Sequence, residues 1–155
     1  MARRLPVIQS PPSEDAPALE RSGPKWLFIG AAFTIVAFLP LSLLSLWAGS
    51  RLARRFASSE TAALLLAALP VLLAYAAAAW GAGAVIGRFG LRAHRAVPAA
   101  SGALAGTSLV LLAVWRGAGP WQLVLGAGCI FVGGGAMFAA LGARFGRKRR
   151  PGLSS

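Results

Sequence analysis

Uncharged apolar segments alternate with short polar and basic segments along the whole chain. Four stretches contain no Lys, Arg, Asp or Glu, and they cover residues 26–50, 61–87, 96–115 and 117–143. The hydrocarbon core of a bilayer is about 30 Å thick, and a helix needs roughly 20 apolar residues to cross it. The four stretches have this length and are apolar all round rather than on one face. The pattern predicts an all-α integral membrane protein, a four-helix bundle with up-down-up-down connectivity.

The polar segments divide the chain into three parts. Residues 1–25 are polar and rich in proline, and we expect a disordered tail because they have little apolar surface to offset the entropy of ordering. Residues 26–143 form the predicted four-helix transmembrane domain, and residues 144–155 form a basic tail. The predicted spans are about 26–47, 62–86, 97–115 and 121–142.

Arginines flank the predicted spans, at the depth where lipid headgroups lie. Arg51, Arg54 and Arg55 follow the first span at spacings of three and four, with Leu52 and Phe56 turned away. This spacing predicts a short interfacial helix on the headgroups. We expect an anionic lipid bilayer as a partner. The predicted headgroup contacts are Arg51, Arg54, Arg55, Arg88, Arg92, Arg95, Arg144 and Arg147.

Basic residues are distributed unevenly between the two sides of the predicted bundle. Four spans place both termini on one side, which holds twelve Lys and Arg, whereas the other side holds four. Cytoplasmic loops carry an excess of Lys and Arg, so we predict that both termini are cytoplasmic. An excess of Arg over Lys and abundant Ala and Gly suggest the inner membrane of a bacterium. Because the basic residues flank the spans, the net charge of +12 indicates membrane anchoring, and we expect no nucleic-acid partner.

Glycines recur at helical spacing in three of the spans. Small residues at such spacing form smooth faces on which helices approach closely. These faces exceed what one compact bundle needs, so we expect a homo-oligomer or a larger membrane protein partner. The predicted helix-packing residues are Gly83, Gly87, Gly102, Gly106, Gly128, Gly135 and Gly142.

One short motif occurs twice. Gly87-Arg88-Phe89-Gly90 closes the second predicted span, and Ala143-Arg144-Phe145-Gly146 closes the fourth. A duplicated helical hairpin explains this recurrence, as does the preference of Arg and Phe for membrane interfaces. We favour the second explanation.

Side chains that carry chemistry are sparse. No carboxylate lies in any span, although ion-coupled carriers generally hold one at depth. His94 is the only histidine and lies in a basic loop without neighbouring metal ligands. Ser101 and Ser108 have no histidine at their depth, and Cys129 is the only cysteine. We therefore expect no catalytic, cofactor-binding or metal-binding residue, and no enzymatic activity.

These observations favour a small non-enzymatic membrane protein that acts as an accessory or assembly subunit and packs through its Gly- and Ala-rich helix faces. The alternative is a small oligomeric channel or carrier for a neutral or anionic solute. In that case Thr34, Tyr75, Thr107 and Gln122 are the polar side chains available to line a path.

Overall fold

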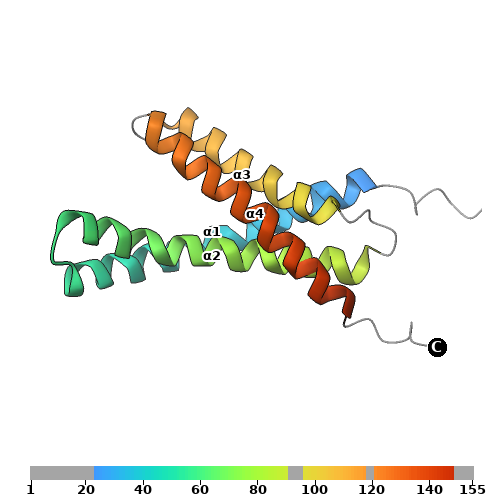
Figure 1. Cartoon of the computed structure of the whole chain (residues 1–155), viewed down its shortest axis with the longest axis horizontal. Coiled ribbons are helices and arrows are strands. Elements are labelled where there is room, and N and C mark those ends of the chain that lie inside the picture. Colours follow the sequence, from blue (N-terminus) through green and yellow to red (C-terminus); the bar gives the residue numbers. More distant parts are fainter. Residues whose placement is uncertain (1–22, 91–95, 118–120, 149–155) are drawn as a thin grey trace, which may run out of the picture.

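The computed structural model describes residues 23–90, 96–117 and 121–148, and this part of the chain forms four α-helices (Figure 1). All four helices are long and apolar enough to cross a membrane. The predicted all-α fold is confirmed, and the chain is a multi-pass membrane protein. The predicted N-terminal tail up to residue 22, the loop with Arg92, His94 and Arg95, and residues 149–155 lie outside the described residues. The helix bounds are Gly23–Phe56 for α1, Glu60–Phe89 for α2, Val97–Trp115 for α3 and Trp121–Lys148 for α4.

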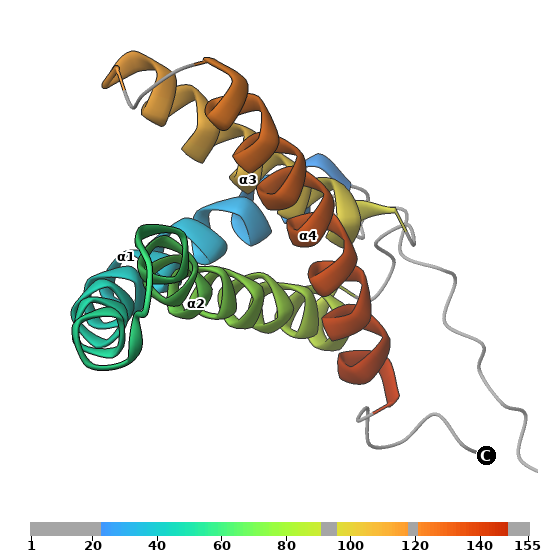
Figure 2. The ribbon, with the colours of Figure 1, turned by 60° about the vertical axis from the view of Figure 1, so that its left-hand side comes forward.

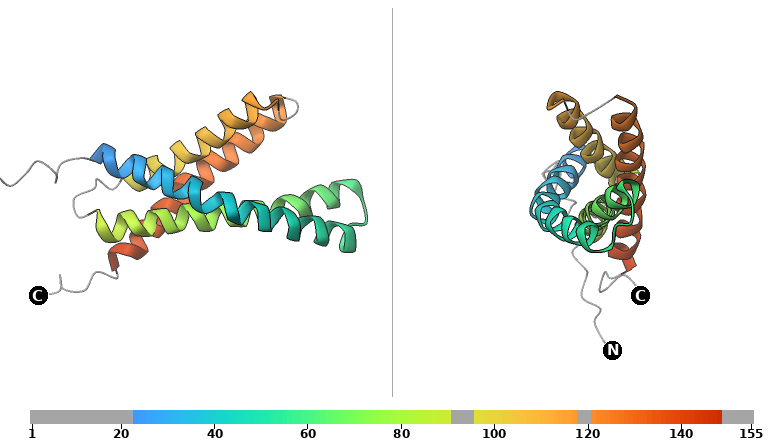
Figure 3. Two further views of the ribbon diagram at one scale, coloured as in Figure 1. Left: turned by 180° about the vertical axis from the view of Figure 1, so that it is seen from behind. Right: turned by 90° about the vertical axis from the view of Figure 1, so that its left-hand side faces the viewer.

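The helices form two antiparallel hairpins that cross each other. α1 pairs with α2, and α3 pairs with α4 (Figure 1). The hairpins diverge toward the end where α1 leads into α2 and α3 leads toward α4, as Figure 2 and Figure 3 also show. We call this the tip end. The opposite end, where α1 and α3 begin and α2 and α4 finish, is the base end. α2 contacts α4 extensively across the crossing, and α1 contacts α3.

Local side-chain and backbone signals terminate the helices at the tip end. Ser59 is the N-cap of α2, and its hydroxyl oxygen accepts a hydrogen bond from the Ala62 N–H at 3.2 Å. Glu60 in the first turn favours this helix start, because the N-terminal end of a helix carries partial positive charge. Gly117 has a φ of +67°, a left-handed conformation that glycine adopts without steric cost, and it ends the turn that follows α3. These signals keep the tip connections short.

α1 continues without interruption beyond the predicted end of the first span at Trp47. Gly49 lies directly against α2, because a Cβ there would be 2.7 Å from the carbonyl oxygen of Ala67. Close packing of α1 on α2 therefore extends past Trp47. The separate interfacial helix expected for the arginine-rich segment is wrong, since this segment forms the last turns of α1. At 1.5 Å per residue the 34 residues of α1 span about 51 Å, more than the hydrocarbon core requires.

The contact between α2 and α4 is a backbone-to-backbone contact. A Cβ on Gly83 would overlap the carbonyl group of Ala139, and a Cβ on Gly87 would overlap that of Ala143. Ala139 and Ala143 are both fully buried. Helices approach this closely only where side chains are absent or small. These residues therefore set the distance between the two hairpins.

We predict that Gly83→Ala destabilises the bundle, whereas Gly81→Ala does not. A methyl group at residue 83 forces α2 and α4 apart, which costs about 1–3 kcal/mol of unfolding free energy, as overpacking typically does. A methyl group at Gly81 would meet only the Phe33 ring, at 3.8 Å, and alanine is the better helix former by about 1 kcal/mol. Reversible unfolding in detergent micelles, followed by circular dichroism, measures both. Equal stability of the two variants would contradict the assigned contact.

Candidate helix-packing and lipid-contact sites

The predicted packing glycines of α3 lie against α4. Gly102 and Gly135 face each other, because a Cβ on either one would overlap the carbonyl group of the other. One turn along α3, a Cβ on Gly106 would be 2.6 Å from the carbonyl oxygen of Phe131. The α3–α4 hairpin is therefore held by the same kind of close backbone approach as the α2–α4 crossing.

The remaining predicted glycines of α4 face two different helices. Gly142 lies against the Trp80 carbonyl group of α2, whereas a Cβ on Gly128 would be 3.4 Å from the Val110 side chain of α3. Gly146, one turn after Gly142, also lies against the backbone of α2. The stripe of α4 that contains Gly128, Gly135 and Gly142 is thus occupied by other helices of the same chain.

A different set of α4 glycines faces away from the bundle. A Cβ on Gly126, Gly133 or Gly134 would meet nothing within 4 Å. At 100° per residue, Gly133 lies about 200° around the helix from Gly135. Ile130 and Met137 share this side and are more than half exposed. We call these five residues the open face of α4. Sequence reasoning missed it, although the angular offset of Gly133 from the Gly128–Gly142 stripe is readable from the sequence.

Tyr75 of α2 contacts all three other helices at the point where the hairpins cross. Its hydroxyl group donates a hydrogen bond to the carbonyl oxygen of Gly102 at 3.1 Å. Its ring meets Phe38 of α1 edge-on at 5.5 Å and Phe131 of α4 at 4.8 Å between centroids. A Cβ on Gly135 would overlap the tyrosine hydroxyl group, so the glycine makes room for this oxygen. Both the hydroxyl group and the ring of Tyr75 therefore make contacts within the chain.

The other polar side chains within the spans do not converge on a common site. Thr34 is fully buried, and its hydroxyl donates to the Gly30 carbonyl of its own helix at 2.9 Å. Thr107 and Gln122 are exposed, and Thr107 also bonds within its own helix. Thr34, Tyr75, Thr107 and Gln122 therefore line no shared path within one chain. The channel or carrier alternative requires an oligomer and has no specific observation in its favour.

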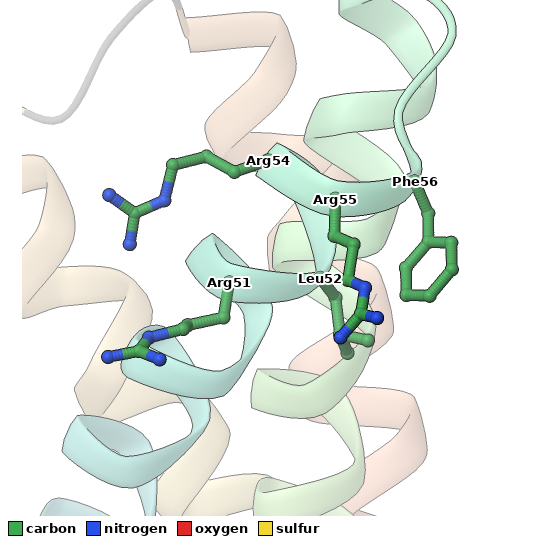
Figure 4. Close-up of a pocket in the computed structure, with 5 residues that line it drawn as sticks. All are labelled: Arg51, Leu52, Arg54, Arg55 and Phe56. Atoms are coloured by element: carbon green, nitrogen blue, oxygen red, sulfur yellow. The ribbon is translucent and has the colours of Figure 1, made fainter.

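Three arginines surround a shallow pocket of about 680 Å³ at the tip end of α1. Arg51 and Arg54 extend to the same side of the helix (Figure 4). The Arg51 guanidinium lies 4.7 Å from the centre of the Trp47 ring, and the Arg55 guanidinium 5.7 Å from that of Phe56. Leu52 and Phe56, expected on the opposite side from the arginines, line this same pocket. Figure 4 nevertheless shows the Phe56 ring on the other side of the helix from the Arg51 and Arg54 side chains.

The base end carries the remaining described lipid-contact candidates. Arg88 lies in the last turn of α2, with its guanidinium 5.7 Å from the centre of the Phe89 ring. Arg144 and Arg147 lie on the last turns of α4. Glu60, at the tip end, is the only acidic residue in the described parts of the chain. The base-end cations therefore have no described carboxylate near them, and a negatively charged surface complements them.

Chemistry-bearing side chains are few in the described ranges. No three His, Cys, Asp or Glu side chains in these ranges come together as a possible metal site, and Cys129 is an exposed free thiol. The chain matches no protein-family model, no curated protein and no solved structure. The functional interpretation therefore depends on the surfaces of this membrane protein.

We predict that Tyr75 and Gly135 are energetically coupled. Tyr75→Phe removes one buried hydrogen bond and lowers the unfolding free energy by about 1 kcal/mol. Gly135→Ala costs more in the parent chain than in the Tyr75→Phe background, because the hydroxyl group that the new methyl would strike is then absent. A double-mutant cycle in detergent measures the coupling, expected to be at least about 0.5 kcal/mol. Strictly additive effects would show that the hydroxyl and the glycine are independent.

Proposed function

We propose that this protein is a non-enzymatic accessory or assembly subunit of the bacterial inner membrane. The open face of α4 carries the proposal. Glycine in a helix interior costs up to about 1 kcal/mol relative to alanine. Within the described part of the chain, no atom lies within 4 Å of the place that a Cβ on Gly126, Gly133 or Gly134 would take. Small residues allow helices to approach each other closely at interfaces within membranes. These glycines would have this role if the transmembrane helix of another protein packed on the open face.

The charges at the base end of α4 favour a different protein over a second copy of this chain. Arg144 follows Gly133 by eleven residues, and Lys148 follows Met137 by eleven residues. Eleven residues bring a helix to within about 20° of the starting direction, so both cations lie on nearly the same side of α4 as the open face. Two copies inserted in the same orientation would pair their α4 helices in parallel and bring these cations together. Like charges at such positions repel. A partner helix with acidic or uncharged residues at that depth avoids this repulsion.

We further propose that the base end, with both termini, faces the cytoplasm. The basic residues assigned to that side outnumber those on the other side by three to one. Arg51, Arg54 and Arg55 oppose this bias. Their position at the end of a helix of about 51 Å supports headgroup contact beyond the hydrocarbon core.

Reporter fusions in a bacterial host test the orientation. We expect a fluorescent green protein fused after Ser155 to mature, and alkaline phosphatase inserted between Ser58 and Glu60 to be active. The first reporter matures only in the cytoplasm and the second only in the periplasm. The opposite pattern would reverse the proposed orientation.

Site-specific photo-crosslinking in intact cells tests the assembly role. A photoreactive amino acid at residue 130 or 137 should give one discrete adduct, whereas the same probe at Leu73, an exposed site on α2, should not. Gly133→Leu should abolish the adduct by holding the partner helix away, while leaving the fold intact because the space there is open. Ala77→Leu, at an exposed position of α2, is the matched control and should keep it.

The mass of the adduct identifies the kind of partner. An adduct with the mass of two copies would replace the hetero-partner by a homo-oligomer. If residues 130 and 137 give no adduct, or if the adduct survives Gly133→Leu, the open face is not a protein interface and the proposed function is wrong.

A further inference from the structure

An apolar cavity of about 410 Å³ lies between the two hairpins, on the tip side of their crossing. Phe38 forms its wall on α1, and Leu109 and Ala113 form its wall on α3. Val124 and Ala127 line it from α4. Each of its described walls belongs to a helix that is long and apolar enough to span the membrane. The two hairpins separate on this side of their crossing (Figure 2).

Aromatic rings close the cavity toward the crossing. Phe38 and Phe131 both line it, with ring centroids 6.4 Å apart, and each ring also packs against Tyr75. The other lining residues of α3 and α4 lie between these rings and the tip end. The cavity is therefore closed at the middle of the bundle and extends along the hairpins toward one membrane surface.

The lining of the cavity is apolar throughout. From Val124 to Phe131 it follows seven residues of α4, or roughly 10 Å of helix. Lipid alkyl chains are the apolar molecules that surround a membrane protein at this depth, and such a chain matches the apolar lining.

A cation lies beyond the tip end of the cavity. Arg116 directly follows α3 and keeps helical backbone angles. It therefore lies about one helical turn beyond Ala113, on the side of α3 that carries Leu109 and Ala113. Trp115 is the last residue of α3 and Trp121 is the first residue of α4. Both side chains are largely exposed, as tryptophans at the bilayer interface are. An apolar cavity in line with an interfacial guanidinium group matches the acyl chain and the phosphate group of one phospholipid.

We propose that the angle between the hairpins binds one glycerophospholipid, with an acyl chain in the cavity and the phosphate group at Arg116. Gly133 and Met137 of the open face lie about 80° or more around α4 from the cavity residues Val124, Ala127 and Phe131, whereas Gly134 lies on the same side as Ala127. The lipid fills the space that the diverging hairpins leave and so supports their separation.

Photo-crosslinking to the unmodified chain tests the site without any substitution. The parent protein is reconstituted in vesicles that contain a phosphatidylglycerol with a diazirine in one acyl chain, and the labelled peptides are mapped by mass spectrometry. We expect labelling to concentrate on the α3 and α4 segments around Ala113 and Ala127. Labelling that is no stronger there than on the exposed surfaces of α1 and α2 would overturn the proposal.

Native mass spectrometry after mild detergent extraction tests the same site with variants. The parent chain should retain one phospholipid, and the double variant Ala113→Phe/Ala127→Phe should lose it because the new rings fill the cavity. Arg116→Gln should weaken retention about tenfold, the effect of losing a charge-assisted hydrogen bond. Ala77→Phe, on the exposed surface of α2, is the matched control for added bulk and should retain the lipid.

The arginine cluster of α1 provides the control for charge. The triple variant R51Q/R54Q/R55Q removes three cations from the same membrane side but from the other hairpin, and it should retain the lipid. Loss of the lipid in this variant, with retention in Arg116→Gln, would place the headgroup at α1 and overturn the proposal. Retention in a folded Ala113→Phe/Ala127→Phe chain would overturn it as well.

Discussion

Close backbone contact between α2 and α4 holds the two hairpins together. Lipid tails are as apolar as the helices, so association inside a membrane depends on dispersion contacts rather than on the hydrophobic effect. Such contacts require a close approach, which Gly83 and Gly87 allow against Ala139 and Ala143. These residues lie in the base halves of the two helices. Toward the tip end α2 carries leucines that include Leu65, so the helices cannot continue at the same distance.

The divergence of the hairpins follows from this uneven distribution of small residues. At the crossing, the space between the helices is filled by the rings of Phe38, Tyr75 and Phe131. Beyond the rings, the two hairpins separate and leave the apolar cavity. A packed crossing and an open tip end are therefore two consequences of one pattern of residue sizes, and the proposed lipid site depends on both.

The glycines of α4 serve two different surfaces. Gly135 and Gly142 lie against neighbouring helices of the chain, whereas Gly126 and Gly133 face outward with no described atom in contact range. A helix with small residues on two sides can pack within its own bundle and still accept another helix. This division separates the residues on which folding depends from those on which the proposed assembly depends.

The sequence by itself determined the number and approximate position of the helices, because crossing a bilayer requires a local run of about 20 apolar residues. The bounds of α3 agree with the predicted 97–115 span, and the Ser59 cap was readable from local chemistry. Only the tertiary structure decided which faces meet, since helices that are apolar all round carry no amphipathic signal for an inside or an outside. It showed that Gly135 packs within the chain and Gly133 does not, and that α1 stays helical through Arg55. The cavity could not be read from the sequence either, because its walls are residues of three helices brought together by contacts elsewhere.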